Sequence, residues 1–180
     1  MKALKALKTL QTLHEYDLTL FNRLNALRLN EDIIRLNCYI SRSGDGHLYL
    51  LLLVWSGWQQ GYQSPFFMAI LAGFAIERPV YYTLKNSLKR NRPESVLEDF
   101  RSVIKPADRF SFPSGHTSAA FMIAVLCGCF YPAVFLLLLG WALLVGVSRI
   151  VLGVHFPTDI LVGMALSVST ALISREIIQS

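Results

Sequence analysis

The apolar residues of this chain fall into long blocks, and these blocks constrain its fold more than any other feature. Of its 180 residues, 53% are hydrophobic and only 16% are charged, which is too apolar for an ordinary soluble domain. A helix needs about 20 apolar residues to cross a bilayer. Most of the five candidate blocks are near that length: 47–59, 65–85, 114–130, 132–148 and 158–173. The sequence therefore predicts an integral membrane protein, an all-α bundle of about five transmembrane helices.

The segment before the first block has a different pattern. Leucines recur every third residue at Leu4, Leu7, Leu10 and Leu13, and further apolar residues then alternate with charged ones. This pattern is typical of amphipathic helices that lie on a membrane surface. A frayed tail is the alternative. Lys2, Lys5 and Lys8 interrupt any apolar run, so we do not expect a cleaved signal peptide.

The rest of the sequence indicates a single domain. It contains no repeat or low-complexity tract, and its one sizeable polar loop covers residues 89–112. We expect one membrane-embedded domain over 1–180, with an amphipathic interfacial segment at 1–46 and a transmembrane core at 47–180. The three cysteines lack the further ligands that a zinc site needs, so we read them as packing residues.

Polar side chains gather at four ends of the predicted spans. They are Lys85 at the end of the second span, Ser114 at the start of the third, Arg149 after the fourth and Asp159 at the start of the fifth. Because consecutive spans cross the membrane in alternating directions, all four ends lie on one face. The sequence therefore predicts that three distant segments meet in one site.

Two basic residues form the first of these segments. Lys85 and Arg92 are seven residues apart, close to two helical turns, although Pro93 disfavours helix at Arg92. Arginine offers a planar fork to phosphate oxygens, and lysine offers a point charge. The alternative is that both side chains reach from a membrane interface to water, like their neighbours Lys89 and Arg90.

The second segment, Pro113-Ser114-Gly115-His116, is suited to start a helix that binds an anion. Proline and serine favour a helix start, and glycine permits close approach of the backbone. Free amide groups at that terminus and the Ser114 hydroxyl form an anion cradle. His116 lies within a turn of the anion and can exchange a proton near neutral pH. A plain helix cap with an interfacial histidine is the alternative.

The third segment places Arg149, His155 and Asp159 within a short hydrophobic loop. Gly153 and Pro157 mark a turn before the last block. With Pro157 in the first helical turn, Asp159 can reach back to one imidazole nitrogen of His155 and leave the other as a nucleophile. The alternative is a charge-paired helix cap, but such a set is costly in apolar surroundings without a function.

Together the three segments resemble the signature of the type-2 phosphatidic acid phosphatase and vanadium haloperoxidase superfamily, in its membrane lipid phosphatase branch. The matching positions are Lys85, Arg92-Pro93, Pro113-Ser114-Gly115-His116, Ser148-Arg149, His155 and Asp159. No signature position departs from the pattern, and the resemblance extends through the helical core to the C-terminus. The turn at 43–46 also resembles the family's entry turn, although an ordinary Gly-Asp turn explains it equally well.

The resemblance implies a role for each residue. His155 attacks phosphorus and forms a phosphohistidine, Asp159 orients and polarises His155, and His116 protonates the departing oxygen and then activates water. The phosphate-binding residues are Lys85, Arg92, Ser114, Gly115 and Arg149. Neutralising the charge on the phosphoryl oxygens is the dominant requirement of this chemistry. No metal or other cofactor is implied, and the sequence lacks a carboxylate cluster that would hold magnesium.

The apolar spans favour a lipid phosphate as the substrate over the vanadate of the soluble haloperoxidases. Phosphatidic acid, phosphatidylglycerol phosphate and undecaprenyl pyrophosphate all fit, and the sequence does not choose among them. We expect membrane lipids, and no nucleic acid, as partners. A non-catalytic lipid-phosphate binder or transporter is the alternative, but binding alone needs only the basic residues and neither histidine.

The small size and short loops favour a bacterial inner-membrane protein. The resemblance implies that the site faces the periplasm. The face that bears the site also bears most lysines and arginines, which the positive-inside rule places in the cytoplasm. The two arguments oppose each other, and we expect the periplasmic orientation because several of these cations serve the site.

Overall fold

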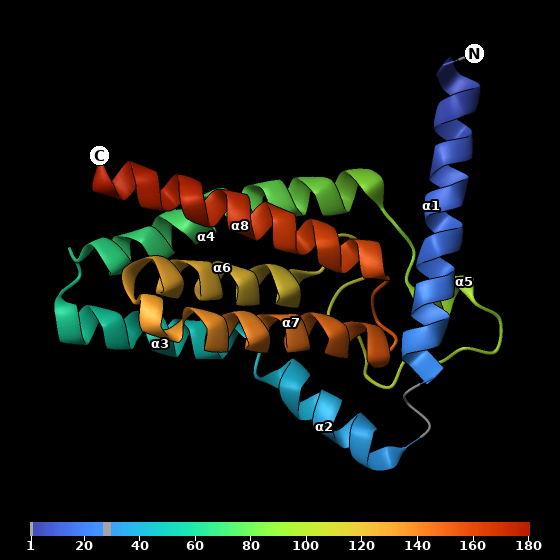
Figure 1. Ribbon diagram of the computed structural model, residues 1–180, viewed down its shortest axis with the longest axis horizontal. Helices are drawn as coiled ribbons and strands as arrows, with labels where there is room; N and C mark the ends of the chain where they lie inside the picture. Colours follow the sequence, from blue (N-terminus) through green and yellow to red (C-terminus); the bar gives the residue numbers. More distant parts are fainter. Residues whose placement is uncertain (1, 27–29) are drawn as a thin grey trace.

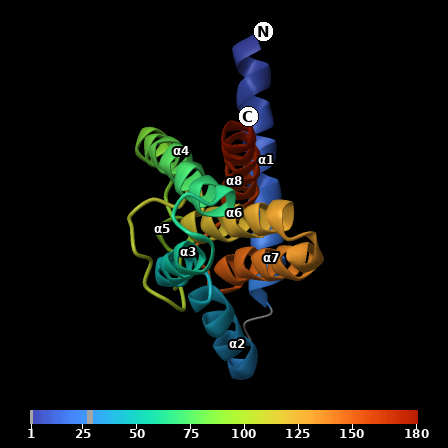
Figure 2. The same cartoon turned by 90° about the vertical axis from the view of Figure 1, so that its left-hand side faces the viewer.

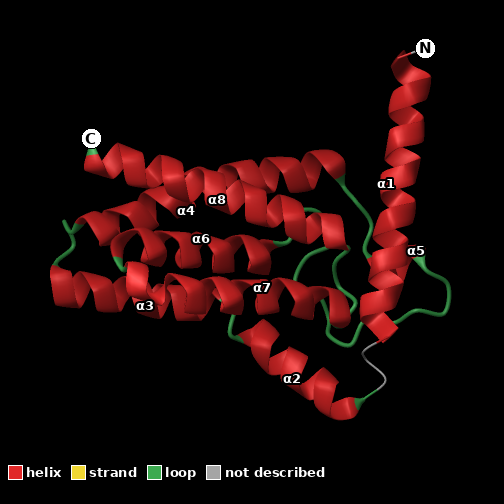
Figure 3. Ribbon diagram, viewed as in Figure 1, coloured by secondary structure: helices red, strands yellow, loops and turns green. Residues whose placement is uncertain are grey.

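The computed structural model describes residues 2–26 and 30–180, and side chains from residue 12 onward except residue 13. Over these residues the chain is helical and contains no strand (Figure 3). Its elements are α1 (Lys2–Asn25), α2 (Glu31–Arg42), α3 (Gly46–Gln60), α4 (Pro65–Leu88), α5 (Pro93–Val96), α6 (Gly115–Phe130), the 3₁₀ helix η2 (Pro132–Val134), α7 (Phe135–Val151) and α8 (Pro157–Gln179). The predicted all-α class is confirmed.

Five helices, α3, α4, α6, α7 and α8, run side by side as a bundle (Figure 1). In the end view α6 lies at the centre, where it packs against α4, α7 and α8 (Figure 2). Its side chains are mostly buried, Phe121 and Met122 among them. The outer helices instead leave large apolar side chains uncovered, such as Leu136 and Leu137 of α7, which are 78% and 75% exposed. An apolar outer surface of this kind suits contact with lipid.

Each predicted apolar block corresponds to one bundle helix, although α4, α7 and α8 extend further toward their C-terminal ends. Two segments, Pro132–Val151 and Pro157–Gln179, are long and apolar enough to cross a membrane, and α6 is apolar but shorter. α3 has only 15 residues, and α4 carries Glu77 and Arg78 in its interior. The number of spans therefore stays a prediction.

A polar layer crosses the centre of the bundle. Glu77 of α4 is fully buried and accepts a hydrogen bond of 2.7 Å from Nη2 of Arg78. It also accepts one from Ser118 of α6, whose hydroxyl lies 2.6 Å from that of Ser167 on α8. A buried carboxylate needs such partners, so this layer fixes α4, α6 and α8 relative to one another.

α1 lies across one end of the bundle instead of joining it (Figure 1). Its buried residue Phe21 packs against Ile150 and Phe156, at the junction of α7 and α8. Asp17, also buried, accepts a hydrogen bond of 2.9 Å from the backbone N–H of Thr158. A carboxylate is favourable there because it lies at the N-terminus of α8. The leucines behind the amphipathic prediction, at positions 4, 7, 10 and 13, lie outside the described side chains.

Candidate active site

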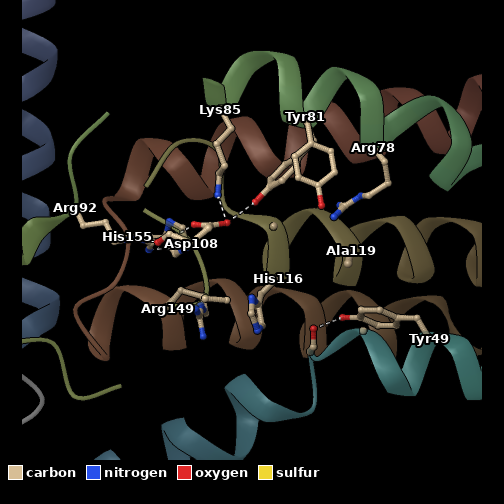
Figure 4. Close-up of a pocket in the computed structure, with 15 residues that line it drawn as sticks. Tyr49, Arg78, Tyr81, Lys85, Arg92, Asp108, His116, Ala119, Arg149 and His155 are labelled. Atoms are coloured by element: carbon tan, nitrogen blue, oxygen red, sulfur yellow. Dashed lines mark hydrogen bonds and ion pairs between the residues drawn. The ribbon is translucent and has the colours of Figure 1, made fainter. Parts of the chain in front are cut away.

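A cavity of about 240 Å³ lies near the end of the bundle that α1 crosses (Figure 4). Six of the eight site residues predicted from the sequence line it: Lys85, Arg92, Gly115, His116, Arg149 and His155. The other two, Ser114 and Asp159, are fully buried and are not part of its lining. The structure therefore brings the three distant segments together at one place.

Three buried basic residues form part of the wall. Lys85 lies in the last turn of α4 and Arg149 in the last turn of α7, whereas Arg92 precedes α5. Nη1 of Arg92 donates to the carbonyl oxygen of Val154 at 2.6 Å, and Nη1 of Arg149 donates to Oγ of Ser41 at 2.5 Å. Nε of Arg149 is buried without a partner among the described residues. Three buried cations, one of which has an unused donor, suit an anionic ligand.

Asp108, in the loop before α6, bridges two of these cations. Its Oδ2 lies 2.6 Å from Nζ of Lys85 and accepts a hydrogen bond from Tyr81, and its Oδ1 pairs with Nη2 of Arg92 (Figure 4). Burial raises the pKa of Asp108, but Lys85 and Arg92 outweigh it and hold that pKa below its usual value. The carboxylate is therefore ionised. Sequence reasoning missed Asp108, because nothing distinguishes it from the other acidic residues of this loop.

Ser114 starts α6 as its N-cap. Its hydroxyl lies 2.9 Å from that of Thr117, and its backbone N–H donates to the carbonyl oxygen of Asp159 at 3.0 Å. Gly163 of α8 permits this contact, since a Cβ there would lie 2.7 Å from the carbonyl oxygen of Ser114. The hydroxyl therefore caps the helix. Within this segment, Gly115 and His116 are the residues that line the cavity.

His155 lies in the loop between α7 and α8 and is 2% exposed. Its Nε2 lies 3.5 Å from Nη1 of Arg92, on the cavity side, and its Nδ1 lies 3.6 Å from Oδ2 of Asp159. That second distance is longer than a hydrogen bond, and Nδ1 has no other partner among the described residues. Burial lowers the pKa of His155 to about 4, although Asp159 opposes the shift. The imidazole is therefore neutral near pH 7, as a nucleophile must be.

Arg90 fixes the carboxylate behind His155. Its Nη1 donates to Oδ1 of Asp159 at 2.8 Å, its Nη2 pairs with Asp17 of α1, and its guanidinium lies over the ring of Phe156. Oδ2 of Asp159 accepts the backbone N–H of Phe156 at 2.8 Å. Sequence reasoning read Arg90 as an interfacial side chain and attached no role to Asp17. A single sequence carries no signal that joins residues so far apart.

His116 has a carboxylate partner that was not assigned from the sequence. Its Nε2 lies 2.8 Å from Oδ1 of Asp45, in the turn between α2 and α3. The only available signal was the Gly-Asp-Gly turn, which an ordinary loop explains equally well. Both histidines of the cavity thus have a carboxylate close to one ring nitrogen.

Two histidines with nearby carboxylates and three buried basic residues around one cavity define a site suited to phosphoryl transfer. Residues 63–180 match the model of the PAP2 superfamily. The chain belongs to the PAP2 superfamily, which is the superfamily that its motifs resemble.

Two of the relatives are named as phosphatases. Phosphatidylglycerophosphatase B of Bacillus subtilis is 32% identical over 117 residues, which cover 55% of this chain and 51% of that protein. The decaprenylphosphoryl-5-phosphoribose phosphatase of Mycolicibacterium smegmatis is 36% identical over 100 residues, or 53% of this chain and 51% of that protein. The chain thus matches about half the length of these relatives.

A solved structure shares the fold over nearly the whole chain. It is the first transmembrane PAP2 type phosphatidylglycerolphosphate phosphatase from Bacillus subtilis, with a TM-score of 0.77 and 24% identity. The match covers 93% of this chain and 87% of that one. Since the family match begins at residue 63, this likeness extends the shared architecture into the N-terminal third.

Proposed function

We propose that the protein is an integral membrane phosphatase that hydrolyses a phosphate monoester or a pyrophosphate of a lipid. The observation that carries the proposal is the cavity, in which buried cations surround two histidines with nearby carboxylates. Membership of the PAP2 superfamily supports it, and so do the lipid phosphates in the names of the two relatives.

The first step transfers the phosphoryl group to His155. Nδ1 of His155 faces Asp159 and holds the proton, so Nε2 is the nucleophile. A bond forms between Nε2 and phosphorus while the bond from phosphorus to the lipid oxygen breaks. His116 gives its proton to that oxygen, which leaves as the lipid alcohol or the lipid monophosphate.

The second step releases phosphate. Water attacks phosphorus, the bond to Nε2 of His155 breaks, and His116 takes a proton from the water. Lys85, Arg92 and Arg149 neutralise the phosphoryl oxygens in both steps, and the backbone N–H of Gly115 adds a donor at the start of α6. Ser114 contributes by capping that helix. The proposed reaction uses no metal.

An adjoining apolar cavity supports a lipid substrate. It has a volume of about 250 Å³ and shares Gly46, Tyr49, Arg78 and Ala119 with the catalytic cavity. Its remaining wall is largely apolar and includes Leu50, Leu53, Ile70 and Phe74, from α3 and α4. A chain that enters between these helices would place its phosphate beside the histidines and its tail against apolar side chains.

The membrane arrangement belongs to the same proposal. The five bundle helices span the bilayer as a core over 47–180, and the segment 1–46 lies at the interface, so 1–180 forms one domain. The position of α1 across the end of the bundle supports this arrangement (Figure 1). We place the protein in a bacterial inner membrane with its site toward the periplasm, against the positive-inside count.

The test is phosphate release by the detergent-purified chain in the presence of EDTA. Phosphatidic acid, phosphatidylglycerol phosphate and undecaprenyl pyrophosphate are supplied in parallel, with His155→Ala as the matched control. We expect release from at least one lipid by the wild-type chain and none by the variant. Binding of these lipids by folded wild-type protein without release would support the alternative, a binder or transporter.

A further inference from the structure

The turn between α2 and α3 reaches the catalytic cavity from outside the family match. Gly44 and Gly46, the first residue of α3, line the cavity, and Asp45 contacts His116. Ser41, in the last turn of α2, accepts a hydrogen bond from Arg149. Neither the PAP2 match, which begins at residue 63, nor the three sequence segments include these residues. The turn therefore adds a fourth chain segment to the site.

The carboxylate of Asp45 forgoes its ordinary local partner. Asp45 is the N-cap of α3. At this position aspartate usually accepts a hydrogen bond from a backbone N–H of its own helix, which stabilises the helix by about 1 kcal/mol. Here its side chain makes no such hydrogen bond. It reaches across to α6 instead, where its Oδ1 lies 2.8 Å from Nε2 of His116. This pair replaces a local cap with a contact to a catalytic candidate.

The turn is held firmly enough to position that carboxylate. Tyr49 donates to the carbonyl oxygen of Gly44 at 3.0 Å, and Nε1 of Trp141 donates to Oγ of Ser43 at 2.8 Å. A Cβ on Gly44 would lie 2.8 Å from Cγ1 of Val145, so the turn packs directly against α7. Asp45 therefore sits on backbone fixed from both α3 and α7.

We propose that Asp45 is a positioning residue that prepares His116 for proton transfer in the reaction proposed above. Its carboxylate accepts the Nε2–H of His116, which leaves Nδ1 as the nitrogen that faces the substrate. In the first step Nδ1–H passes its proton to the departing lipid oxygen, and in the second Nδ1 takes a proton from the attacking water. Nε2–H stays on the ring throughout, and the carboxylate stabilises the protonated ring, which also faces Arg149.

This role makes a prediction that a purely structural role does not. An alkyl phosphate needs a proton on its departing alkoxide, whereas the p-nitrophenolate of p-nitrophenyl phosphate leaves without one. The value of kcat/KM reports only the steps up to departure, so the hydrolysis of the phosphoenzyme does not affect it. Loss of Asp45 should therefore lower kcat/KM selectively for the alkyl phosphate.

The experiment measures kcat/KM for phosphatidic acid and for p-nitrophenyl phosphate with the full chain in detergent micelles. For Asp45→Asn we expect a loss of roughly tenfold to a hundredfold on phosphatidic acid, part of the 10²–10⁴ that a general acid contributes. On p-nitrophenyl phosphate the change should stay within about threefold. The matched control is Asp32→Asn, an exposed carboxylate on α2, which should leave both values unchanged.

The outcomes separate this inference from the proposed function. No turnover of either substrate by the wild-type chain would count against the function itself. Turnover by the wild type, with Asp45→Asn unchanged or reduced equally on both substrates, would overturn the role of Asp45 and leave the function standing. If the asparagine variant does not fold, Asp45→Glu, which keeps the charge but displaces it, must show the same selective loss in smaller measure.

Discussion

At the scale of single residues, Asp108 bridges two of the cations that the proposed mechanism gives to the phosphate group. Its two carboxylate oxygens face Lys85 and Arg92, the cations that the proposed mechanism assigns to the phosphoryl oxygens. A phosphate dianion that reaches these cations must displace the carboxylate or share them with a like charge. Because its pKa is held below the usual value, Asp108 competes in this way even at mildly acidic pH.

Replacement of Asp108 by asparagine should therefore tighten phosphate binding. We expect the inhibition constant of inorganic phosphate to fall roughly tenfold, equivalent to about 1.4 kcal/mol. Competitive inhibition of p-nitrophenyl phosphate turnover measures it. The control is Asp99→Asn, an exposed residue of the same loop whose φ of 58° asparagine tolerates. An inhibition constant that stays the same or rises for Asp108→Asn would contradict this account.

The site residues predicted from the sequence carry a local signal in one chain, whereas their partners do not. Lys85, His116 and His155 stand in short motifs whose spacing is visible in one chain. Asp45, Asp108 and Arg90 act through contacts with residues distant in sequence, and their own surroundings are ordinary turns and loops. Tertiary packing creates these partners, so a single sequence without its fold does not identify them.

At the scale of secondary-structure elements, α1 is joined to the site by a chain of charges. Asp17 pairs with Arg90, and Arg90 in turn donates to Asp159, which lies behind His155. Asp17 is almost fully buried, so its carboxylate depends on these partners. α1 thus helps to fix the orientation of the proposed nucleophile as well as the start of α8.

Replacing Asp17 by alanine should test this link. Removing one partner of a buried ion pair costs about 3–5 kcal/mol of stability. We expect a loss toward the lower end of that range, because Arg90 keeps its ion pair with Asp159. We also expect a lower kcat, since Arg90 is then free to shift. Thermal unfolding in detergent and lipid phosphatase kinetics measure both. Glu15→Ala, an exposed site on the same helix, serves as control, and wild-type stability of Asp17→Ala would refute the link.

The helices themselves were largely predictable, because apolar block length and helix-start residues such as Ser114 are local signals. The ends of the helices were less predictable. α4 continues past Lys85 to Leu88, where Lys89 adopts a left-handed conformation with φ 46° and ends the helix. The short helix α5 was not predicted, since four residues carry no periodicity.

At the scale of the whole molecule, alternation of helix direction gathers the site at one end of the bundle (Figure 1). The C-terminal ends of α4 and α7 and the N-terminal ends of α6 and α8 meet there, and α1 and the turn before α3 close around them. This convergence was predictable from the sequence, because consecutive spans cross the membrane in alternating directions. The position of the N-terminal helices was not predictable, because amphipathic helices have no fixed place relative to a bundle.

The central claim is that His155 carries the phosphoryl group. The most direct measurement incubates the chain with ³²P-labelled p-nitrophenyl phosphate and quenches in alkaline detergent, in which phosphohistidine survives. The His116→Ala variant is the best trap, because its phosphoenzyme forms without a general acid but lacks the base for hydrolysis. We predict label on His155 in this variant and none in His155→Ala. Label on another residue, or turnover by His155→Ala, would contradict the account.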